Sequence, residues 1–477
     1  MSPPQPPASF VSQGDPAHER AVVEAARQLL FERAMATIAG HPAGALAAIP
    51  QMRGAEKTAV HDLNYTELFI RDNVPVMVYL LVEGKFEIVR HFLDICLGLQ
   101  SREPLTLGIF PTSFFEEDGR LVADYGQRAI GRVTSVDATL WWPILAHAYL
   151  RRSGDHAWAA SETVQSGIER LLALVLKPGF RDAPTLLVPD GAFMIDRPLD
   201  VWGTPLEIQV LLYGALRSAA HLLDARHQEL ARRAEEWARR LRGYLLKFFW
   251  VNTKVIEVLR RRPTEQYGER VVNEYNIQTE TIPHWLQHWL GLRGGYLIGN
   301  IRTGRPDFRF FTLGNCLGAI FDILSPVQQL ALFDLVVHNQ GELVAEMPLR
   351  ICHPPLEGEK WRSVTGFDPK NRPWCYHNGG HWPCLLWYLA MAVLRGRARG
   401  LSATQLGPAE QLLDRTYHMH LARLPRQRWA EYFDGPTGLW TGQQARYYQT
   451  WTIVGFLLTH HLLYGDPRDA HILDLPT

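Results

Sequence analysis

The sequence lacks the features that mark several large classes of protein. Its five cysteines are scattered, odd in number and without a CxxC pair, which argues for free thiols in a reducing compartment and against a disulfide framework or a zinc cluster. No apolar run reaches membrane-spanning length. Basic and acidic residues number 49 each, so no excess of charge indicates nucleic acid or a charged partner.

Three common catalytic signatures are also absent. The chain has no GxSxG elbow, no GxGxxG after a strand and no phosphate-binding P-loop. Residues Met1–Pro16 are rich in proline and polar side chains but lack the basic and apolar segments of a secretory signal. We therefore expect a disordered tail over 1–16, one catalytic domain over 17–477 and a cytoplasmic location.

Aromatic residues are plentiful. They make up 11% of the chain, and tryptophan alone occurs fifteen times. Such rings serve either as filler in a large helical core or as the walls of a carbohydrate cleft, where the apolar faces of a sugar stack on them. The count alone leaves both interpretations open and favours the core.

Apolar residues recur mainly with the helical period, as in Phe86, Val89 and Leu93. About a dozen helices are predicted by this pattern, which fits a toroid of paired helices, and no fixed repeat supports the rival α-solenoid. Strands are scarce; the candidates are Trp250–Leu259 and a hairpin over Leu186–Met194. Helices in addition to those near the N-terminus are expected near 64–82, 86–97, 134–152, 204–224, 226–249, 279–291, 314–339 (split at Pro326), 378–396, 408–422 and 446–464.

Polar residues at two predicted helix starts are candidates for holding a polar substrate. Arg71 and Asp72 present several donors and acceptors to sugar hydroxyls, or form a partly buried structural ion pair. Asp137 falls in the first turn of a predicted helix, where it also suits the helix dipole.

Asp196 is a candidate general acid. Three apolar residues, Phe193 to Ile195, precede it, and an apolar setting raises a carboxyl pKa and keeps the group protonated near neutral pH. Arg197 beside it has the opposite effect if it faces the same way. The alternative is an ion pair between Asp196 and Arg197 at the end of a loop.

Two later loops complete the candidate set. His377 and His381 are four residues apart, but Gly379 and Gly380 break a helix between them and no carboxylate follows at a matching step, which argues against a metal site. Glu431 lies among Tyr and Trp residues, where a carboxylate can orient a water molecule. The alternative for Glu431 is an ordinary exposed glutamate.

Taken in order along the chain, the motifs resemble those of the alkaline/neutral invertases, a glycoside hydrolase family (family 100). The matches span roughly residues 60 to 460, nearly all of the expected domain. They are Phe69-Ile70-Arg71-Asp72, Gly131-Arg132-Val133 through Asp137, Met194-Ile195-Asp196-Arg197, Gly203 to Gln209, Phe311 to Asn315, Trp361 to Trp382, Glu431-Tyr432 and Tyr448-Gln449-Thr450-Trp451.

The resemblance implies an all-α (α/α)6 barrel with small hairpin and loop insertions, and hydrolysis of sucrose with inversion, without metal or cofactor. Asp196 matches the family's general acid and Glu431 its general base, with Asp190 as the nearest competitor for the acid. The expected substrate-binding residues are Arg71, Asp72, Asp137, Asp190, Arg197, Glu207, Trp361, Arg362, His377, His381, Gln449 and Trp451.

Some positions depart from the family pattern and leave alternatives open. Pro198, Trp202, Thr204 and Phe433 replace residues that are more common there, so the fructose subsite is less secure than the reaction type. A trehalase-like α-glucosidase is one rival, and a non-catalytic sugar-binding protein is another. An isomerase or epimerase on the same barrel would use the two histidines, His377 and His381. The near-zero net charge permits the homo-oligomer that the resemblance suggests.

Overall fold

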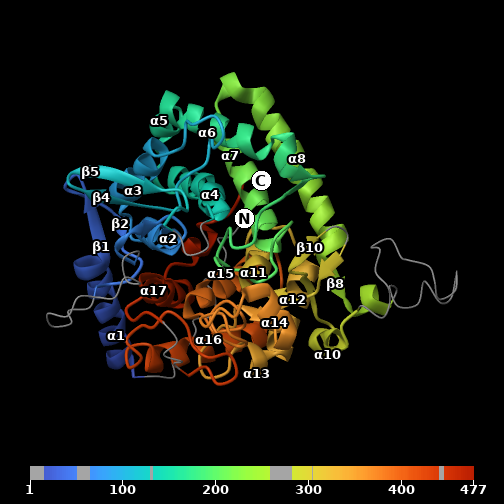
Figure 1. The fold of residues 1–477 in the computed structure, drawn as a ribbon. Helices are drawn as coiled ribbons and strands as arrows, with labels where there is room; N and C mark the ends of the chain where they lie inside the picture. Colours follow the sequence, from blue (N-terminus) through green and yellow to red (C-terminus); the bar gives the residue numbers. More distant parts are fainter. Residues whose placement is uncertain are drawn as a thin grey trace, which may run out of the picture.

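The computed structural model describes residues 15–50, 65–128, 133–257, 282–302, 305–439 and 445–476. Its helices form two concentric rings that alternate along the chain (Figure 1). Each inner helix packs on the next, and the last of them, α17, packs on the first, α2. The inner ring is α2 (Asn73–Val82), α4 (Val136–Ser153), α7 (Leu206–Leu222), α11 (Thr312–Ile320), α15 (Leu386–Ala398) and α17 (Thr450–Tyr464).

The outer helices cover the inner ring from outside. For example, α8 packs on α7, and α16 packs on α15 and α17. Because the inner ring closes, the arrangement is the predicted (α/α)6 barrel, and the open α-solenoid is excluded. The outer ring is α1 (Pro16–Gln28), α3 (Phe86–Gly98), α6 (Glu162–Val175), α8 (Gln228–Tyr244), α12 (Pro326–His338) and α16 (Ala403–Arg423).

The two rings differ in their sequences. Helix α17 is apolar on every side and buries nearly all of its residues, as expected for a helix enclosed by others. Helix α8 instead buries Ala234, Ala238 and Leu241 and pairs arginines with glutamates on its outer face. The alternation of these two kinds of helix along the chain produces the two rings.

Capping residues fix where several outer helices begin. Ser325 and Ser402 form capping boxes with the glutamines three residues later. Asp15 accepts a hydrogen bond from the Ala17 N–H, and Pro16 occupies the first helical turn. The predicted tail therefore overlaps α1 at these two residues, and residues 1–14 lie outside the described part of the chain.

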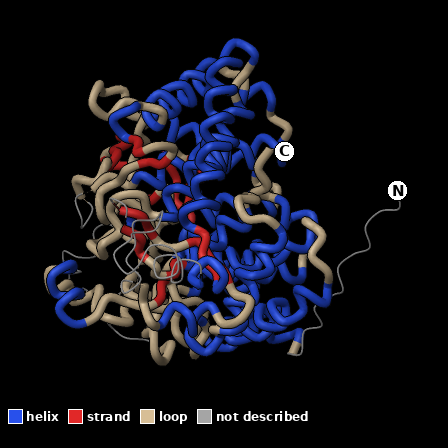
Figure 2. Tube along the Cα trace, turned by 90° about the vertical axis from the view of Figure 1, so that its right-hand side faces the viewer, coloured by secondary structure: helices blue, strands red, loops and turns tan. Residues whose placement is uncertain are grey.

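Short antiparallel strands and long loops gather on one side of the helical body (Figure 2). One sheet has three strands, β3 (Leu68–Phe69), β4 (Ser113–Glu117) and β5 (Arg120–Asp124). The other pairs are β1 (Met35–Ile38) with β2 (His41–Ala45), β6 (Arg181–Asp182) with β7 (Thr185–Leu186), β8 (Trp250–Asn252) with β9 (Gly295–Leu297), β10 (Asn300–Arg302) with β11 (Arg305–Asp307), and β12 (Phe310–Phe311) with β13 (Cys352–His353). Short helices in the loops are α5 (His156–Ala159), α10 (Trp285–Leu290), α13 (Gln340–Leu343) and α14 (Gly358–Thr365).

Some predicted boundaries are wrong. The predicted helix 64–82 begins only at Asn73, because the chain before it pairs as β3. Strand β8 ends at Asn252, and part of the predicted strand, 258–259, lies outside the described residues. The predicted hairpin over 186–194 is also wrong: Leu186 pairs with Arg181, and Val188 pairs with Gly203.

The five cysteines are free and buried, which agrees with the prediction of free thiols. In the described part of the chain, no helix combines the length and the apolar character needed to cross a membrane.

Candidate active site

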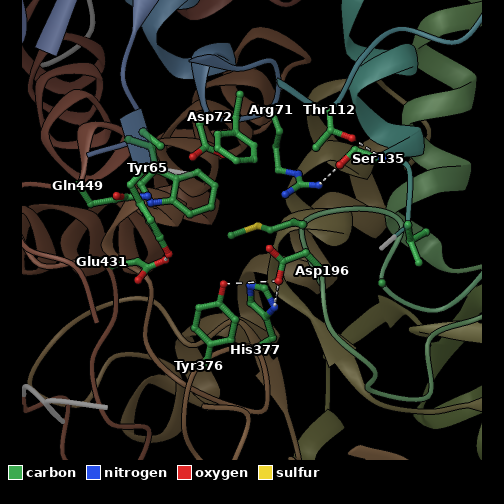
Figure 3. Close-up of a pocket in the computed structure, with 16 residues that line it drawn as sticks. Tyr65, Arg71, Asp72, Thr112, Ser135, Asp196, Tyr376, His377, Glu431 and Gln449 are labelled. Carbon is green, nitrogen blue, oxygen red and sulfur yellow. Dashed lines mark hydrogen bonds and ion pairs between the residues drawn. The ribbon is translucent and has the colours of Figure 1, made fainter. Parts of the chain in front are cut away.

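A cavity lies among the loops that lead into the inner helices (Figure 3). It encloses about 760 Å³ of space, its solvent-open part included, within the range of roughly 300–1,000 Å³ of ligand pockets. Because the N-cap residues of α2, α4 and α17 (Asp72, Ser135 and Gln449) lie in its wall, the positive ends of these three helix dipoles face it. Its walls are Ala47, Tyr65, Phe69, Arg71, Asp72, Thr112, Val133, Ser135, Gly191, Met194, Asp196, Tyr376, His377, Glu431, Gln449 and Trp451.

Asp196 reaches the cavity from the loop before α7 and is loosely held. Its Oδ1 lies 3.5 Å from the Tyr376 hydroxyl and 3.4 Å from His377 Nδ1. The side chain is 39% exposed, but that surface faces the cavity. The surrounding protein desolvates the carboxyl and raises its pKa, an effect opposed by the positive charges of Arg71, Arg197 and Lys370.

Glu431 reaches the same cavity from the loop before α17 and is tightly held. The Tyr65 hydroxyl donates to its Oε1 at 3.1 Å, and the backbone N–H of Arg446 donates to its Oε2 at 3.2 Å. The Lys370 ammonium lies 3.6 Å from Oε2, and the glutamate side chain is only 3% exposed. These partners stabilise negative charge on the carboxylate.

Arg71 and Asp137 form a buried ion pair at one wall. The Arg71 guanidinium donates to both Asp137 oxygens and to the Ser135 hydroxyl at 2.9 Å. Asp137 is fully buried and Arg71 is 11% exposed. Arg71 therefore lines the cavity with its orientation fixed, whereas Asp137 lies behind it, in the first turn of α4 as predicted.

Two further carboxyls favour the protonated form. Desolvation raises the pKa of Asp72 to about 7 against the lowering effect of Arg71, and Asp72 lines the cavity. Desolvation also raises the pKa of Glu207 to about 8, helped by the negative charge of Asp137. Glu207 accepts a hydrogen bond from the Met194 N–H at 3.3 Å, so it supports the Asp196 loop from behind.

Gln449 and Trp451 complete the wall beside Glu431. Gln449 caps α17, and in the amide orientation that satisfies its neighbours it donates to the Ala47 carbonyl and accepts from the Trp451 indole. Both residues line the cavity, and their predicted contact with substrate stays a prediction.

Several predicted site residues lie away from the cavity wall. The Asp190 carboxylate accepts backbone N–H groups of Leu199, Asp200 and Val201. Its oxygens are therefore used to fold the loop that carries Asp196, and Asp190 is not among the residues that line the cavity. Arg197 pairs with Asp368 at 2.7 Å, so it does not form the ion pair with Asp196 that the sequence left open.

Trp361 and Arg362 lie on α14, outside the cavity lining. The Trp361 indole donates to the Asn371 carbonyl at 2.8 Å, and the half-exposed Arg362 pairs with Glu359. The sequence predicted that both residues contact substrate, but neither lines the cavity.

The two histidines have different positions. His377 lines the cavity and stacks on the Tyr376 ring at 3.9 Å, while His381 is buried behind it and contacts the Gly435 carbonyl at 2.8 Å. Desolvation lowers the pKa of His377 well below its usual range and that of His381 to about 3. Both rings are therefore neutral, and among the described residues no group of three or more His, Cys, Asp or Glu is arranged around a metal position.

Three residues of the site were missed from the sequence. Tyr65 and Lys370 contact Glu431, and Tyr376 contacts Asp196. Tyr65 and Tyr376 occur inside or beside the quoted motifs, but no spacing rule connects them to their partners. Lys370 follows the Asp368-Pro369 turn and gives no signal of its own.

Solved structures with the same architecture include several glycosidases. A structure described as a wild-type glycosidase aligns with a TM-score of 0.54 at 12% identity, covering 94% of this chain and 97% of that one. A mannosylglycerate hydrolase of Thermus thermophilus aligns at 0.52 and 13% identity, covering 92% and 99%. At such identities the likeness shows the fold alone, and it agrees with the (α/α)6 barrel formed by the two rings of helices.

Sequence relatives show the family to which the chain belongs. The profile of the family described as alkaline and neutral invertase matches residues 26–466. An alkaline/neutral invertase of Arabidopsis thaliana is 40% identical over 460 residues, covering 93% of this chain and 80% of the relative. A mitochondrial neutral/alkaline invertase of Oryza sativa subsp. japonica is 40% identical over 465 residues, covering 93% and 71%. The chain therefore belongs to the alkaline and neutral invertase family, and it is a glycosidase.

Proposed function

We propose that this enzyme hydrolyses the α-glucosyl bond of sucrose with inversion, using Asp196 as the general acid and Glu431 as the general base. One observation carries the proposal: of the three carboxyl groups that line the cavity, Asp196 and Glu431 lie in opposite environments. The desolvated Asp196 favours the protonated form, which can donate to the bridging oxygen. Glu431 is surrounded by donors that favour its ionised form.

The contacts of Glu431 leave room for a water molecule. An ionised carboxylate has about four acceptor positions; Tyr65 and Arg446 use two of them by hydrogen bonds, and the Lys370 ammonium lies beside a third at 3.6 Å. The remaining position can hold a water that attacks the glucosyl carbon, since general-base help requires hydrogen-bond reach. Asp196, the second carboxyl of this pair (Figure 3), protonates the bridging oxygen, and fructose leaves.

Arg71, Asp72, Gln449 and Trp451 are proposed to hold the glucosyl ring. They combine charged and amide groups with an apolar ring face along one wall of the cavity, the mixture that sugar recognition uses. The positive dipole ends of α2, α4 and α17 at this wall favour the ionised base.

A histidine-based isomerase is a weaker candidate. Such a mechanism needs one histidine protonated, but burial lowers the pKa of both His377 and His381. His381 also lies behind the wall, occupied by the Gly435 carbonyl.

Proton NMR of sucrose hydrolysis tests the proposal. If β-glucose appears first, the reaction inverts; if α-glucose appears first, the inverting assignment is wrong. Trehalose in the same assay tests the trehalase-like alternative, since preferential cleavage of trehalose would keep the acid and base but change the substrate. Homo-oligomerisation and a cytoplasmic location stay predictions, and sedimentation velocity tests the first.

A further inference from the structure

Lys370 is a buried ammonium behind the cavity wall. Its side chain is 4% exposed, and its Nζ lies 3.6 Å from Glu431 Oε2. The ammonium donates to the Tyr65 hydroxyl at 3.4 Å and lies 4.0 Å from the centre of the Tyr376 ring. Burial of a charged lysine is costly unless it is paired, so its neighbours must supply the compensation.

The segment that carries Lys370 is tied to the loop of the acid. Asp368 accepts the Lys370 backbone N–H at 3.0 Å and forms an ion pair with Arg197, the residue after Asp196. Asn371 donates to the Pro198 carbonyl at 3.3 Å. One short segment therefore fixes the lysine relative to the Asp196 loop on one side and contacts Glu431 on the other.

Charged and titratable groups reach Lys370 from all the surrounding segments. Desolvation lowers the pKa of Lys370, helped by the positive charges of Arg197 and Arg446 and opposed by the negative charges of Glu431 and Asp196. The rings that face it are Tyr376 and Tyr432, and the hydroxyl is that of Tyr65.

Tyr65 connects the lysine with the base a second time. Its hydroxyl accepts from Lys370 and donates to Glu431 Oε1, while the ammonium itself faces Oε2. Both oxygens of the carboxylate are thereby linked to one cation. Because Lys370 does not line the cavity, it acts on the reaction through the two carboxyls: by contact with Glu431 and, at longer range, by the effect of its charge on Asp196.

We propose that Lys370 is the positioning residue of the base: it keeps Glu431 ionised and oriented, directly and through Tyr65, at a site fixed by the Arg197–Asp368 pair. This inference rests on the proposed function, in which Glu431 is the base. A residue with a purely structural role would hold the loops together without changing the titration of Glu431.

The variant Lys370→Met removes the charge and keeps the length of the side chain. A nearby opposite charge shifts a carboxyl titration by about one pH unit or more, so the acidic limb of kcat/KM is expected to move up by about one unit. The loss of kcat is then largest at low pH, while KM for sucrose changes little. Lys370→Arg keeps a positive charge, so the acidic limb of its kcat/KM profile should lie close to that of the wild type.

Two further variants make the comparison specific. Tyr65→Phe keeps the lysine cation but removes the hydroxyl that bridges it to Glu431. The acidic limb of kcat/KM should therefore move less in Tyr65→Phe than in Lys370→Met. Lys360→Met is the matched control: Lys360 is a largely exposed lysine ten residues earlier that lies 3.9 Å from Asp200. Its profile should coincide with that of the wild type.

A titration that needs no activity completes the test. Carbon-13 NMR of protein labelled at the glutamate carboxyl carbons follows Glu431, identified by the signal lost in Glu431→Gln. In Lys370→Met this signal should titrate at higher pH than in the wild type. An unmoved signal in a folded variant, as judged by circular dichroism, would overturn the inference.

The two failures are distinguishable. If the wild type does not cleave sucrose but the Glu431 signal moves in Lys370→Met, the proposed function fails and the role of Lys370 stands. If sucrose is cleaved with inversion while both the signal and the acidic limb stay in place, the function stands and the role of Lys370 is refuted.

Discussion

Asp196 and Glu431 are chemically similar carboxyls on loops before inner helices, yet their surroundings differ in almost every respect. Asp196 has only long contacts, of 3.4 and 3.5 Å, and 39% exposure toward the cavity. Glu431 has three polar partners and 3% exposure. The surroundings of the two carboxyls, rather than their residue types, therefore distinguish the proposed acid from the proposed base. Desolvation suits a group that gives up a proton, whereas several hydrogen-bond donors suit a group that must stay ionised.

The strongest test of the difference between the two carboxyls is to neutralise each one in turn. Asp196→Asn and Glu431→Gln should each lower kcat on sucrose by about 10³-fold, within the range for loss of general acid or base catalysis. With α-glucosyl fluoride, whose leaving group needs no protonation, only Asp196→Asn should recover. Steady-state kinetics on both substrates measure this, and recovery of Glu431→Gln instead would exchange the roles.

The next largest effect is expected at the ion pair beside the acid. Arg71→Met leaves the fully buried Asp137 unpaired, and breaking such a pair costs about 3–5 kcal/mol of unfolding free energy. Urea denaturation should show this loss, and the double variant Arg71→Met with Asp137→Asn should recover part of it. Equal stability of the single and double variants would contradict a buried, coupled pair.

A smaller effect concerns Glu207, behind the acid loop. Its pKa is raised to about 8 from 4.5, so the folded protein holds a proton that the unfolded chain loses as the pH rises above 4.5. The free energy of unfolding that this group contributes therefore falls as the pH rises from about 4.5 to about 8. Glu207→Gln should flatten that decline in thermal unfolding measured across this range, and an unchanged slope would argue against a protonated Glu207.

The smallest effect is expected at Arg362, which lies apart from both carboxyls. Arg362→Ala removes a half-exposed pair with Glu359, worth at most about 1 kcal/mol. The thermal midpoint and KM for sucrose should both stay close to the wild-type values. A clear rise in KM would restore Arg362 to the substrate-binding set that the sequence predicted.

Helical periodicity is a local signal that survives without tertiary information, so it predicted about a dozen helices and a toroid of paired helices, whereas the (α/α)6 barrel was implied by the family resemblance. The sequence motifs also led to Asp196, Glu431, Arg71 and Gln449, which the cavity brings together. The helix near 64–82 was placed too early because β3 forms only by pairing with a distant strand. Local patterns do not encode such pairings.

The remaining errors share that physical cause. Asp190 looked like a turn residue of a hairpin, but its carboxylate accepts three backbone N–H groups about ten residues ahead. Lys370 and Tyr65 meet across 305 positions of the chain, and Tyr65 meets Glu431 across 366. Spacing arguments work within one helix or turn and carry no information at these separations.

The closed inner ring also sets the order in which the site is completed as the protein is made. Helix α17 packs on α2, and the Thr450 N–H bonds to the Ala47 carbonyl, so the last ring helix seals against one of the first segments synthesised. Asp196 leaves the ribosome long before Glu431, by about ten seconds or more at roughly 5–20 residues per second. A growing chain therefore holds the proposed proton donor before the proposed base, and both carboxyls share one cavity only when the ring is shut.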